Sequence, residues 1–505
     1  MKIALIAAEL FPLAKAGGLA DAVAGLARML SHRGHDVITI IPGYPGAIAA
    51  ATSTGQVRAC GSFAVALGQH TYRFQMYAAR LGDSGLDVRL INCPELFPDD
   101  QVYRHGEPDA VRFAAFTHAA LVACQHMRFS PDIVHCHDWH TALAPLLLRT
   151  TFAWDRLFEQ TRSLLTIHNI GYQGIYSREL CHSMGLADLS LYLDATDLAA
   201  GNINVLRIGL AHAHSLNTVS ISHADEIMND DALVGDLRRT LHERNDRVLG
   251  ITNGIDERTW DPATDPHLWH RYNATNVDSG KRLNKQRLFR ELHMSADHGL
   301  PVIALVSRLT HQKGIDLALG AMDTFMRHND VCLVVAGCGD ACLEDLVVDF
   351  EARWQGRVGY FRQFSEQAAR CALAAADILL MPSRYEPCGL TQMYAMRFGT
   401  VPVVRAVGGL KDTVDAYHHG TAGNGSDGEG ILISSEGVDQ TVSALCEALK
   451  LVTDKRQIQL LRARLMQRDR SWRLPAEHYE RTYHRLHSPR HSFGSDSPEL
   501  ARRVG

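Results

Sequence analysis

Directly after the first apolar run of the chain comes a lysine followed closely by two adjacent glycines. The run ends at Ala8, and the sequence continues as ELFPLAKAGGLAD, with Lys15, Gly17 and Gly18 in front of a helical pattern. Glycines allow backbone N–H groups to approach a phosphate, and the start of a helix adds partial positive charge. The spacing matches neither of the usual nucleotide-binding motifs, so a plain turn that needs flexible glycines is the alternative.

Two cations and a carboxylate follow two further apolar runs. Arg308 and Lys313 come after the run PVIALVS, and Glu386 comes after the run that ends at Met381. An arginine fork and a lysine point charge suit a diphosphate, whereas a carboxylate accepts hydrogen bonds from sugar hydroxyls. Taken by themselves, the two cations also fit a solvated surface, and Glu386 also fits a helix-capping loop.

Histidines and an aspartate crowd the stretch HCHDWH. His135 and His137 would share one face of a strand, which suggests a metal site. A closed zinc site needs four ligands, however, and no second cluster has matching spacing, so we predict no metal. Asp138 at the end of this strand, with His168 and Asn169 at the end of the next, instead predicts a sugar-binding pocket.

These candidate residues require strands whose carboxyl ends meet at one edge of a sheet. Short runs of Val, Ile and Leu alternate with helical patterns, which predicts parallel strands buried on both faces. Strands are expected over residues 2–8, 36–41, 132–137, 163–167, 301–307, 331–336, 377–381 and 401–404, and helices over about 19–30, 141–149 and 315–326. The pattern restarts after Asn253-Gly254. The sequence therefore predicts an α/β fold with two Rossmann-like, doubly wound domains and ligands bound in the cleft between them.

Length, composition and charge limit the class of protein. The 505 residues allow two domains, and the hydrophobic fraction of 46% and charged fraction of 21% are ordinary for a globular chain. Lys plus Arg number 51 and Asp plus Glu number 56, so the net charge of −5 argues against a strongly basic nucleic-acid or membrane surface. No apolar run approaches the ~18 residues of a membrane span, and the N-terminal run is too short for a signal peptide. Eleven cysteines without a CxxC pair indicate free thiols in a reducing cytoplasm.

Several segments together resemble the ADP-glucose-dependent starch and glycogen synthases, a family of GT-B glycosyltransferases. They run in the family's order and are ELFPLAKAGGLADAV, HCHDWHTALAPLLL, TIHNIGYQG, GITNGID, VSRLTHQKGID, PSRYEPCGLTQMYAMRFGT and PVVRAVGGLKDTV. KxGGLAD together with EPCGLTQ is highly specific. The resemblance implies a GT-B fold with an N-terminal acceptor domain over 1–250 and a nucleotide-sugar-binding domain over 251–470. A C-terminal helix over 471–487 would pack back on the N-terminal domain, and residues 488–505 lack periodicity and are expected to be disordered.

The resemblance also implies roles for the residues at the motif positions. The implied catalytic residues are Lys15, His168, Arg308, Lys313 and Glu386, and the implied substrate-binding residues are Gly17, Gly18, Asp21, Asp138, Asn169, Tyr360, Cys388, Gly389, Leu390 and Thr391. In this assignment the three cations surround the donor's phosphates, and the polar groups after the strands at 132–137 and 163–167 line the glucosyl pocket. Glu386 lies at the sugar hydroxyls, Tyr360 contacts adenine, and Asp21 and Tyr103 lie towards the acceptor.

The implied reaction is retaining transfer of glucose from ADP-glucose to the non-reducing end of an α-1,4-glucan in glycogen biosynthesis, with release of ADP. Because fixed cations favour charge separation at the leaving diphosphate, we expect no cofactor and no metal. The expected partners are ADP-glucose and an α-1,4-glucan or maltooligosaccharide, with no nucleic acid and no membrane. The alternatives are a UDP-sugar-dependent GT-B transferase and a catalytically weak glucan-binding paralogue. A nicotinamide oxidoreductase is disfavoured because the chain lacks G-x-G-x-x-G.

The chain departs from the family pattern at four places, one of which is a short loop, DDALVGDLRRTLHER, before the position of the family's LLRERSDR. Ala16 replaces a threonine of the family's KTGG, and His223 lies in TVSISHADEI where the family has TVSPTYAEEI. Gly428-Glu-Gly-Ile431 replaces the motif GTGF. Tyr394 occupies the place where many related transferases carry a ribose-binding glutamate, as it does in the ADP-glucose branch. The departures leave the predicted phosphate residues intact but affect the expected acceptor loop and donor preference.

Overall fold

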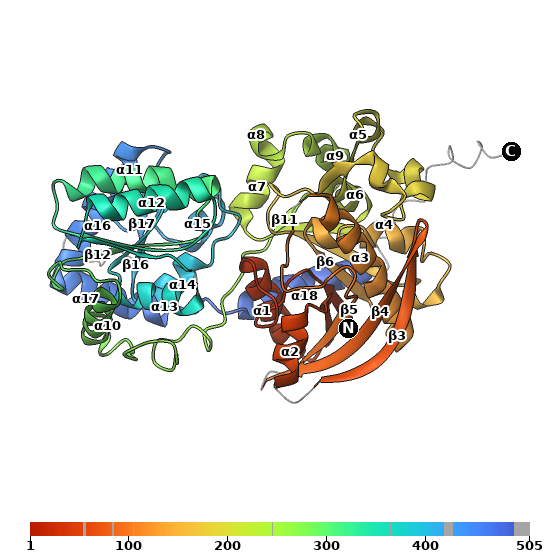
Figure 1. Cartoon of the computed structure of the whole chain (residues 1–505), viewed down its shortest axis with the longest axis horizontal. Coiled ribbons are helices and arrows are strands. Elements are labelled where there is room, and N and C mark those ends of the chain that lie inside the picture. Colours follow the sequence, from red (N-terminus) through yellow and green to blue (C-terminus); the bar gives the residue numbers. More distant parts are fainter. Residues whose placement is uncertain are drawn as a thin grey trace. The chain divides into compact units, whose positions relative to one another are not determined.

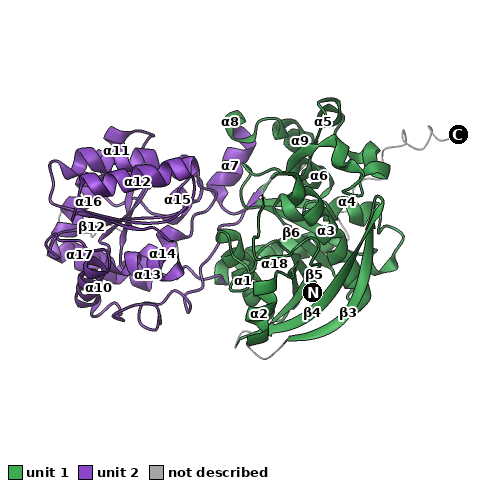
Figure 2. Ribbon diagram, in the orientation of Figure 1, with its two compact units in different colours: residues 1–217, 231–248, 473–505 green, residues 218–230, 249–472 purple. Residues whose placement is uncertain are grey.

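The chain folds into two units, each built around its own sheet (Figure 2). Unit 1 comprises residues 1–217, 231–248 and 473–505, and unit 2 comprises residues 218–230 and 249–472. The structure is a computed structural model that describes residues 1–53, 57–82, 85–104, 106–244, 246–363, 365–418 and 428–488. None of the helices in these ranges is long and apolar enough to cross a membrane.

The largest difference between the units and the predicted domains is one segment, and two boundaries also shift by two residues. Residues 218–230 belong to unit 2, although the sequence places them before the predicted boundary at residue 250. The predicted C-terminal helix is α18 (Arg473–His487), and it belongs to unit 1. Of the tail predicted over 488–505, the residues from 489 onwards lie outside the described residues.

Unit 1 contains a mixed sheet whose central strands are parallel. Its strands are β1 (Lys2–Ile6), β2 (Asp36–Pro42), β3 (Val57–Leu67), β4 (His70–Leu81), β5 (Leu86–Asn92), β6 (Ile133–His137), β7 (Arg162–Ile167) and β10 (Ser215–Thr218). They lie in the order β10-β7-β6-β1-β2-β5-β4-β3. Strands β2 and β5 therefore lie on one side of β1 in the sheet, and β6, β7 and β10 lie on its other side.

The edge of this sheet differs from its centre. Strands β1, β2, β5, β6 and β7 pair in parallel, whereas β4 pairs antiparallel with both β5 and β3. The central strands are short and buried on both faces, as in β6, where every residue is buried. The long hairpin of β3 and β4 (Figure 1) alternates buried and exposed residues. Its two-residue loop contains Gly68 at φ 57, a conformation that favours glycine.

The helices of unit 1 surround this sheet, and a small second sheet lies apart from it. The helices are α1 (Gly18–His32), α2 (Pro45–Ser53), α3 (Glu107–Met127), α4 (Ala144–Arg149), α5 (Ala195–Ala199), α6 (Val205–His212), α8 (Asp231–Val234), α9 (Leu237–Glu243) and α18. The small sheet pairs β8 (Ile175–Ser177) with β9 (Asn202–Asn204). Helix α1 packs on both β2 and α18, so the C-terminal helix covers part of the N-terminal βαβ unit.

Unit 2 contains a sheet in which all described pairs are parallel. Its strands are β12 (Val302–Val306), β13 (Cys332–Ala336), β14 (Val358–Phe361), β15 (Ile378–Met381), β16 (Val401–Arg405) and β17 (Ile431–Ile433). Their order is β14-β13-β12-β15-β16-β17. The chain runs outwards from β12 through β13 and β14, and then from β15 through β16 and β17 in the opposite direction. Each unit is thus doubly wound, as predicted.

Most helices of unit 2 flank its sheet, whereas the first of them in the sequence packs on the helix Gly408–Thr413. The helices of this unit are α7 (Ile221–Asn229), α10 (Val277–Glu291), α11 (Ile315–Met326), α12 (Ala341–Arg353), α13 (Glu366–Ala375), α14 (Thr391–Arg397), α15 (Gly408–Thr413), α16 (Val438–Thr453) and α17 (Lys455–Gln467), and the two-residue strand β11 (Leu249–Gly250) precedes most of them. Figure 1 shows α11 and α12 on one side of the sheet and α13 and α14 on the other. The predicted helix over 315–326 is α11 with the same bounds.

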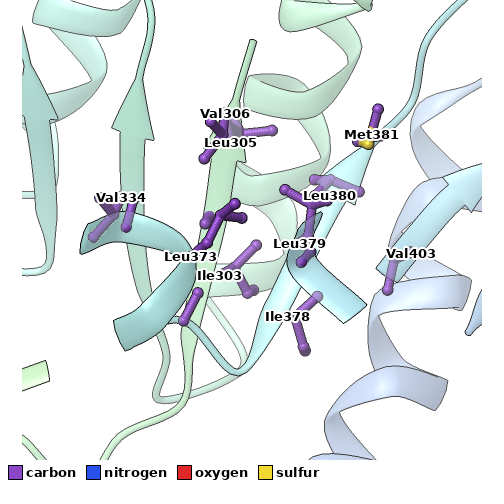
Figure 3. Close-up of a cluster of buried hydrophobic side chains, with 14 of the residues drawn as sticks. Ile303, Leu305, Val306, Val334, Leu373, Ile378, Leu379, Leu380, Met381 and Val403 are labelled. Atoms are coloured by element: carbon purple, nitrogen blue, oxygen red, sulfur yellow. The ribbon is translucent and has the colours of Figure 1, made fainter. Parts of the chain in front are cut away.

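The core of unit 2 explains why its strands are apolar throughout. Ile303 of β12, Leu379 of β15 and Val403 of β16 are fully buried, and Leu373 of α13 packs in the same cluster (Figure 3). Helices cover both faces of the sheet, so successive side chains of each strand enter apolar surroundings whichever face they point to. This removes the alternation of apolar and polar residues that a half-exposed strand would show.

A chain of polar groups attaches α18 to the sheet of unit 1. His135 contacts the hydroxyl of Tyr483 through Nδ1 (2.8 Å) and Thr166 Oγ1 through Nε2 (2.6 Å). Thr166 donates its only hydroxyl proton to Asn217 Oδ1, and Asn217 donates to the hydroxyl of Tyr479. Thr166 must therefore accept from His135 Nε2–H, and His135 Nδ1 must accept from Tyr483. The network fixes the tautomer of His135 and ties the C-terminal helix to three strands.

Removing the hydroxyl of Tyr483 should destabilise unit 1. Tyr483→Phe leaves His135 Nδ1 buried without a donor, and an unsatisfied buried polar group costs about 1–3 kcal/mol. Chemical denaturation followed by circular dichroism should give an unfolding free energy lower by that amount. Arg485→Ala, on the exposed side of the same helix, should change it by no more than about 0.5 kcal/mol. Equal stabilities for the two variants would show that this hydrogen bond contributes nothing.

Candidate active site

In unit 1 the predicted site residues follow the strands at which the sheet order reverses. Strands β1 and β6 are neighbours from which the chain proceeds in opposite directions. Loops after such strands diverge and leave room for a ligand beyond the carboxyl ends. Lys15, Gly17 and Gly18 follow β1, Asp138 follows β6, and His168 follows β7. The topology thus brings the predicted residues of unit 1 to one edge of its sheet.

Glu9 organises the loop that contains the two glycines. It is 2% exposed, and its Oε2 accepts hydrogen bonds from the backbone N–H groups of Ala16 (2.6 Å) and Gly17 (2.8 Å). Its Oε1 accepts a hydrogen bond from the hydroxyl of Tyr103. One of the amides predicted to face a phosphate is therefore held by a carboxylate in this structure. Sequence analysis assigned no role to Glu9, and only its place directly after β1 could have pointed to it.

Lys15 and Asp21, predicted separately for phosphate and acceptor, lie together. Their side chains form an ion pair of 3.0 Å and are partly exposed. The ammonium also lies 5.0 Å from the centre of the Phe11 ring. Asp21 is in the first turn of α1, where a carboxylate also interacts favourably with the helix dipole.

Asp138 holds the backbone that follows β7. Its Oδ1 accepts from the N–H groups of His168 (2.6 Å) and Asn169 (3.3 Å), and its own φ is 57°. Burial raises the pKa of Asp138 to about 7, although these two hydrogen bonds lower it, and the charge of Glu9 raises it further. Asp138, His168 and Asn169 therefore form one connected group, as expected for a single pocket.

The histidines of HCHDWH make contacts with other side chains, and these contacts differ from a metal site. His137 Nδ1 lies 2.9 Å from His168 Nε2, and the ring of His140 stacks on Tyr103 at 4.7 Å. Burial lowers the pKa of His168 to about 3 and that of His140 to about 3, so both rings are neutral at pH 7. Among the described residues, no group of three or more His, Cys, Asp or Glu side chains is arranged to hold a metal.

In unit 2 the predicted residues again follow the two neighbouring strands between which the strand order reverses. Arg308 and Lys313 follow β12, and Glu386 follows its neighbour β15. Lys313 Nζ lies 2.5 Å from Glu386 Oε2, which also accepts from Ser383 Oγ at 3.2 Å. The side chains of Lys313 and Glu386 are 15% and 6% exposed. Arg308 is exposed, and its guanidinium makes no hydrogen bond or ion pair with another described residue, although its backbone carbonyl accepts from Ser307 and Thr310.

A glycine places Lys313 beside the loop that contains Glu386. The short helix His311–Lys313 ends at Gly314, whose φ is 64°. A Cβ atom there would lie 2.4 Å from the carbonyl oxygen of Pro382. Gly314 therefore permits both the left-handed turn and the close approach of the two loops. Gln312 strengthens this approach, because its side-chain amide donates to the carbonyl of Tyr385.

Helix α7 supports the Glu386 loop from another part of the sequence. Ser220 Oγ donates to the carbonyl of Pro387 (2.5 Å), and Glu226 accepts from the N–H of Gly408 (2.7 Å). The next residue, Gly409, donates its N–H to the carbonyl of Glu386 (2.9 Å). These contacts explain why residues 218–230 belong to unit 2. Sequence analysis did not find this support, because nothing local in the sequence relates α7 to a loop some 160 residues later.

The other predicted residues of unit 2 have varied surroundings. Cys388 is buried, and Gly389, Leu390 and Thr391 lead into α14. Tyr360 is buried at the end of β14, and its hydroxyl donates to the carbonyl of Gly337. No hydrogen bond, ion pair or ring contact joins Tyr360 to Arg308, Lys313 or Glu386. Tyr394 stacks on Trp260 with ring centres 3.6 Å apart, so it also forms part of the core of the unit.

The raised pKa of Asp138 predicts a specific pH dependence of stability. Between pH 4 and pH 7 the folded protein keeps a proton on Asp138 that the unfolded chain has released, so the unfolding free energy falls as pH rises through this window. Asp138→Asn keeps the oxygen acceptor and does not titrate. The difference in unfolding free energy, variant minus wild type, should therefore rise by on the order of 3 kcal/mol between pH 4.5 and pH 8. A difference that does not change with pH would contradict the assignment.

Comparison with known proteins identifies the family. The family model described as "Starch synthase catalytic domain" matches residues 2–242, and that described as "Glycosyl transferases group 1" matches residues 293–457. The glycogen synthase of Geotalea uraniireducens is 39% identical over 494 residues, which cover 96% of this chain and 98% of the relative. Glycogen synthase 2 of Geobacter sulfurreducens is 37% identical over 488 residues, with the same two shares.

A solved structure agrees with the relatives found by sequence. The catalytic domain of starch synthase IV from Arabidopsis thaliana, bound to ADP and acarbose, is 30% identical and has a TM-score of 0.86. The match covers 96% of this chain and 99% of that one. The α/β GT-B fold and the glycosyltransferase activity predicted from the sequence are thereby confirmed. The chain belongs to the glycogen and starch synthase family, whose members synthesise glucans by glucosyl transfer.

Proposed function

We propose that the protein transfers glucose from ADP-glucose to the non-reducing end of an α-1,4-glucan, with retention of configuration and release of ADP. The observation that carries this proposal is the pair of cations after β12, of which Lys313 is held by Glu386 and Arg308 has no partner among the described residues. An exposed arginine beside a restrained ammonium suits a diphosphate. The relative solved with ADP and acarbose supports a nucleotide donor and a glucan acceptor.

The cations of unit 2 would act on the leaving group. When the bond between the anomeric carbon and the phosphate oxygen breaks, negative charge grows on the diphosphate and positive charge grows on the sugar ring. Fixed positive charge near the diphosphate therefore stabilises the transition state more than the ground state. Glu386 holds Lys313 through one of three ammonium N–H donors, so the others can reach a phosphate while the side chain keeps its position. Glu386 Oε1 can accept from a sugar hydroxyl.

The polar groups of unit 1 would bind the sugar. His168 and Asn169 offer a ring nitrogen and an amide beside the buried Asp138 carboxyl, and such groups bind the hydroxyls of a glucosyl unit. Lys15 would bind a phosphate of the donor. That phosphate would compete with Asp21 for the Lys15 ammonium group. The carboxylates of this group already have other roles in this assignment, because Asp138 Oδ1 accepts two backbone N–H groups and Asp21 pairs with Lys15. We therefore favour front-face transfer, with the leaving phosphate accepting the proton of the acceptor hydroxyl.

Cysteine chemistry supports a proposal for the compartment. All eleven cysteines are free thiols in this structure, and several are buried in apolar surroundings. Burial raises the pKa of the Cys388 thiol to about 12, so it is not a reactive thiolate at neutral pH. Free thiols suit a reducing compartment, which supports a cytoplasmic location.

Two other functions are tested by the same assay. A UDP-sugar transferase would use the same cations, because a diphosphate is common to both donors. A catalytically weak glucan-binding paralogue would bind maltooligosaccharides without extending them. The purified protein should be incubated with maltooligosaccharides and either ADP-glucose or UDP-glucose, and chain length and kcat/KM measured. Longer chains with a higher kcat/KM for ADP-glucose support the proposal. A preference for UDP-glucose, or binding without extension, favours one of the two alternatives.

Activity should not depend on a divalent metal ion. Arg308 and Lys313 supply at the diphosphate the positive charge that a magnesium ion supplies in other transferases. The rate of ADP release should therefore survive exhaustive chelation. A loss of tenfold or more that Mg²⁺ or Mn²⁺ restores would overturn this prediction.

Lys313 is the residue whose charge should matter most for kcat. Lys313→Gln keeps a hydrogen-bond donor for the buried Glu386 but removes the charge, so the unit should fold. We expect kcat to fall on the order of 10²–10³-fold, with a smaller change in the KM for the donor. Lys313→Arg should recover only part of the rate, because a planar fork replaces a point charge.

Lys455→Gln, at an exposed lysine that begins α17, provides the matched control and should leave kcat unchanged. Lys313→Ala is less informative, since it removes both the charge and the hydrogen-bond donor from the buried Glu386 and should destabilise unit 2 more than Lys313→Gln does. If folded Lys313→Gln keeps more than about a third of the wild-type kcat, the role of Lys313 at the leaving phosphate is refuted.

A further inference from the structure

Two neutral imidazole rings contact each other at the proposed glucosyl pocket of unit 1. His137 Nδ1 and His168 Nε2 are 2.9 Å apart, a hydrogen-bond distance. His137 is 1% exposed, and burial holds its pKa well below the usual range, as it does for His168. A neutral ring carries one N–H, so one ring donates and the other accepts. The two possible arrangements give His168 opposite tautomers.

The surroundings of His137 distinguish the two arrangements. If His168 donated, the proton of His137 would have to be on Nε2. That nitrogen is buried and has no hydrogen-bond partner among the described residues. If His137 donates from Nδ1, the orphan Nε2 is a bare lone pair and no N–H group is left unpaired. Buried N–H groups without an acceptor are rare in folded proteins, so the second arrangement is favoured.

The position of His137 is fixed independently of His168. Its backbone N–H donates to Thr141 Oγ1 (2.7 Å), and the same hydroxyl donates back to the carbonyl of His137. Its ring packs against that of His135 at 4.2 Å, and the hydrogen bonds of His135 to Tyr483 and Thr166 fix that ring in turn. His137 is therefore held in place by contacts within the protein.

We propose that His137 is a positioning residue that fixes His168 in the Nδ1–H tautomer, so that His168 presents an N–H donor to a substrate hydroxyl. His168 is partly exposed, and its Nδ1 has no partner among the described residues. This inference rests on the proposed function for the identity of the ligand, a glucosyl hydroxyl. A donor of fixed position requires the sugar hydroxyl to accept at this nitrogen, which leaves the proton of that hydroxyl for another acceptor.

The first test reads the tautomer directly and needs no activity. In ligand-free protein labelled with ¹⁵N-histidine, the ¹⁵N chemical shifts of each ring distinguish a protonated from a bare nitrogen. The signals of His168 are assigned by their loss in His168→Gln. We expect His168 to carry its proton on Nδ1 at pH 7. A proton on Nε2 would overturn the proposal.

Two variants of His137 test the cause. His137→Leu fills a similar volume without a donor, and His168 should then move towards the Nε2–H form that free imidazole favours. His137→Asn can place an amide N–H near the former Nδ1 and should restore the Nδ1–H form. The kcat/KM for the donor should fall about tenfold in His137→Leu and recover to within about threefold in His137→Asn. Equal tautomers and equal kcat/KM in both variants would refute the role of His137.

The outcomes separate this inference from the proposed function. If the wild type has His168 as Nδ1–H but transfers no glucose, the proposed function fails and the assigned tautomer stands. If it extends maltooligosaccharides while His168 is Nε2–H, the function stands and the role of His137 fails. Circular dichroism on each variant identifies loss of folding, and the wild-type spectrum decides the tautomer even if both variants unfold.

Discussion

The reversal of strand order in each sheet is the constraint on which the rest of the structure depends. Where two neighbouring parallel strands send the chain in opposite directions, their following loops diverge, and polar side chains can occupy the space without disturbing a helix–sheet contact. Unit 1 reverses between β1 and β6, and unit 2 reverses between β12 and β15. The apolar strands that surround these points are buried on both faces, and this burial keeps the loop residues in fixed positions.

Carboxylates bind many of the donor groups of these loops. Glu9 holds two loop amides, Asp21 holds Lys15 and Glu386 holds Lys313, whereas Arg308 is unpaired among the described residues. An anionic ligand must therefore displace or share these partners. The arrangement keeps the donor groups in place but lowers the affinity for an anionic ligand in the ground state. Donor groups that do not need to reorganise stabilise developing negative charge best.

What the sequence predicts well is local. The bounds of α11 and the places of Lys15, Arg308 and Glu386 after strands follow from runs of apolar residues and from turn residues, each within about ten positions. The hairpin of β3 and β4 was not predicted, because its strands are half exposed and lie at an edge, where the apolar signal is weak.

What the sequence does not predict depends on distant pairs. The contact of Glu9 with Tyr103 joins residues 94 positions apart, and that of Ser220 with Pro387 joins residues 167 apart. The proton between His137 and His168 depends on an orphan nitrogen that only a packed structure reveals. The family resemblance names residues at motif positions, but it does not name the side chains that hold them there.

Three of the departures from the family pattern involve residues whose contacts the structure shows. Ala16 lacks the family's hydroxyl, yet Glu9 binds its backbone N–H, which any residue would supply. His223 is fully buried, and its Nδ1 lies 3.1 Å from Glu226 Oε2, while the other carboxylate oxygen of Glu226 still accepts from Gly408. At the third departure, Glu429 is buried and pairs with Arg470 and Arg468. Each replacement thus has a partner within its own unit, and the backbone contacts that position Gly17 and Glu386 are present alongside them.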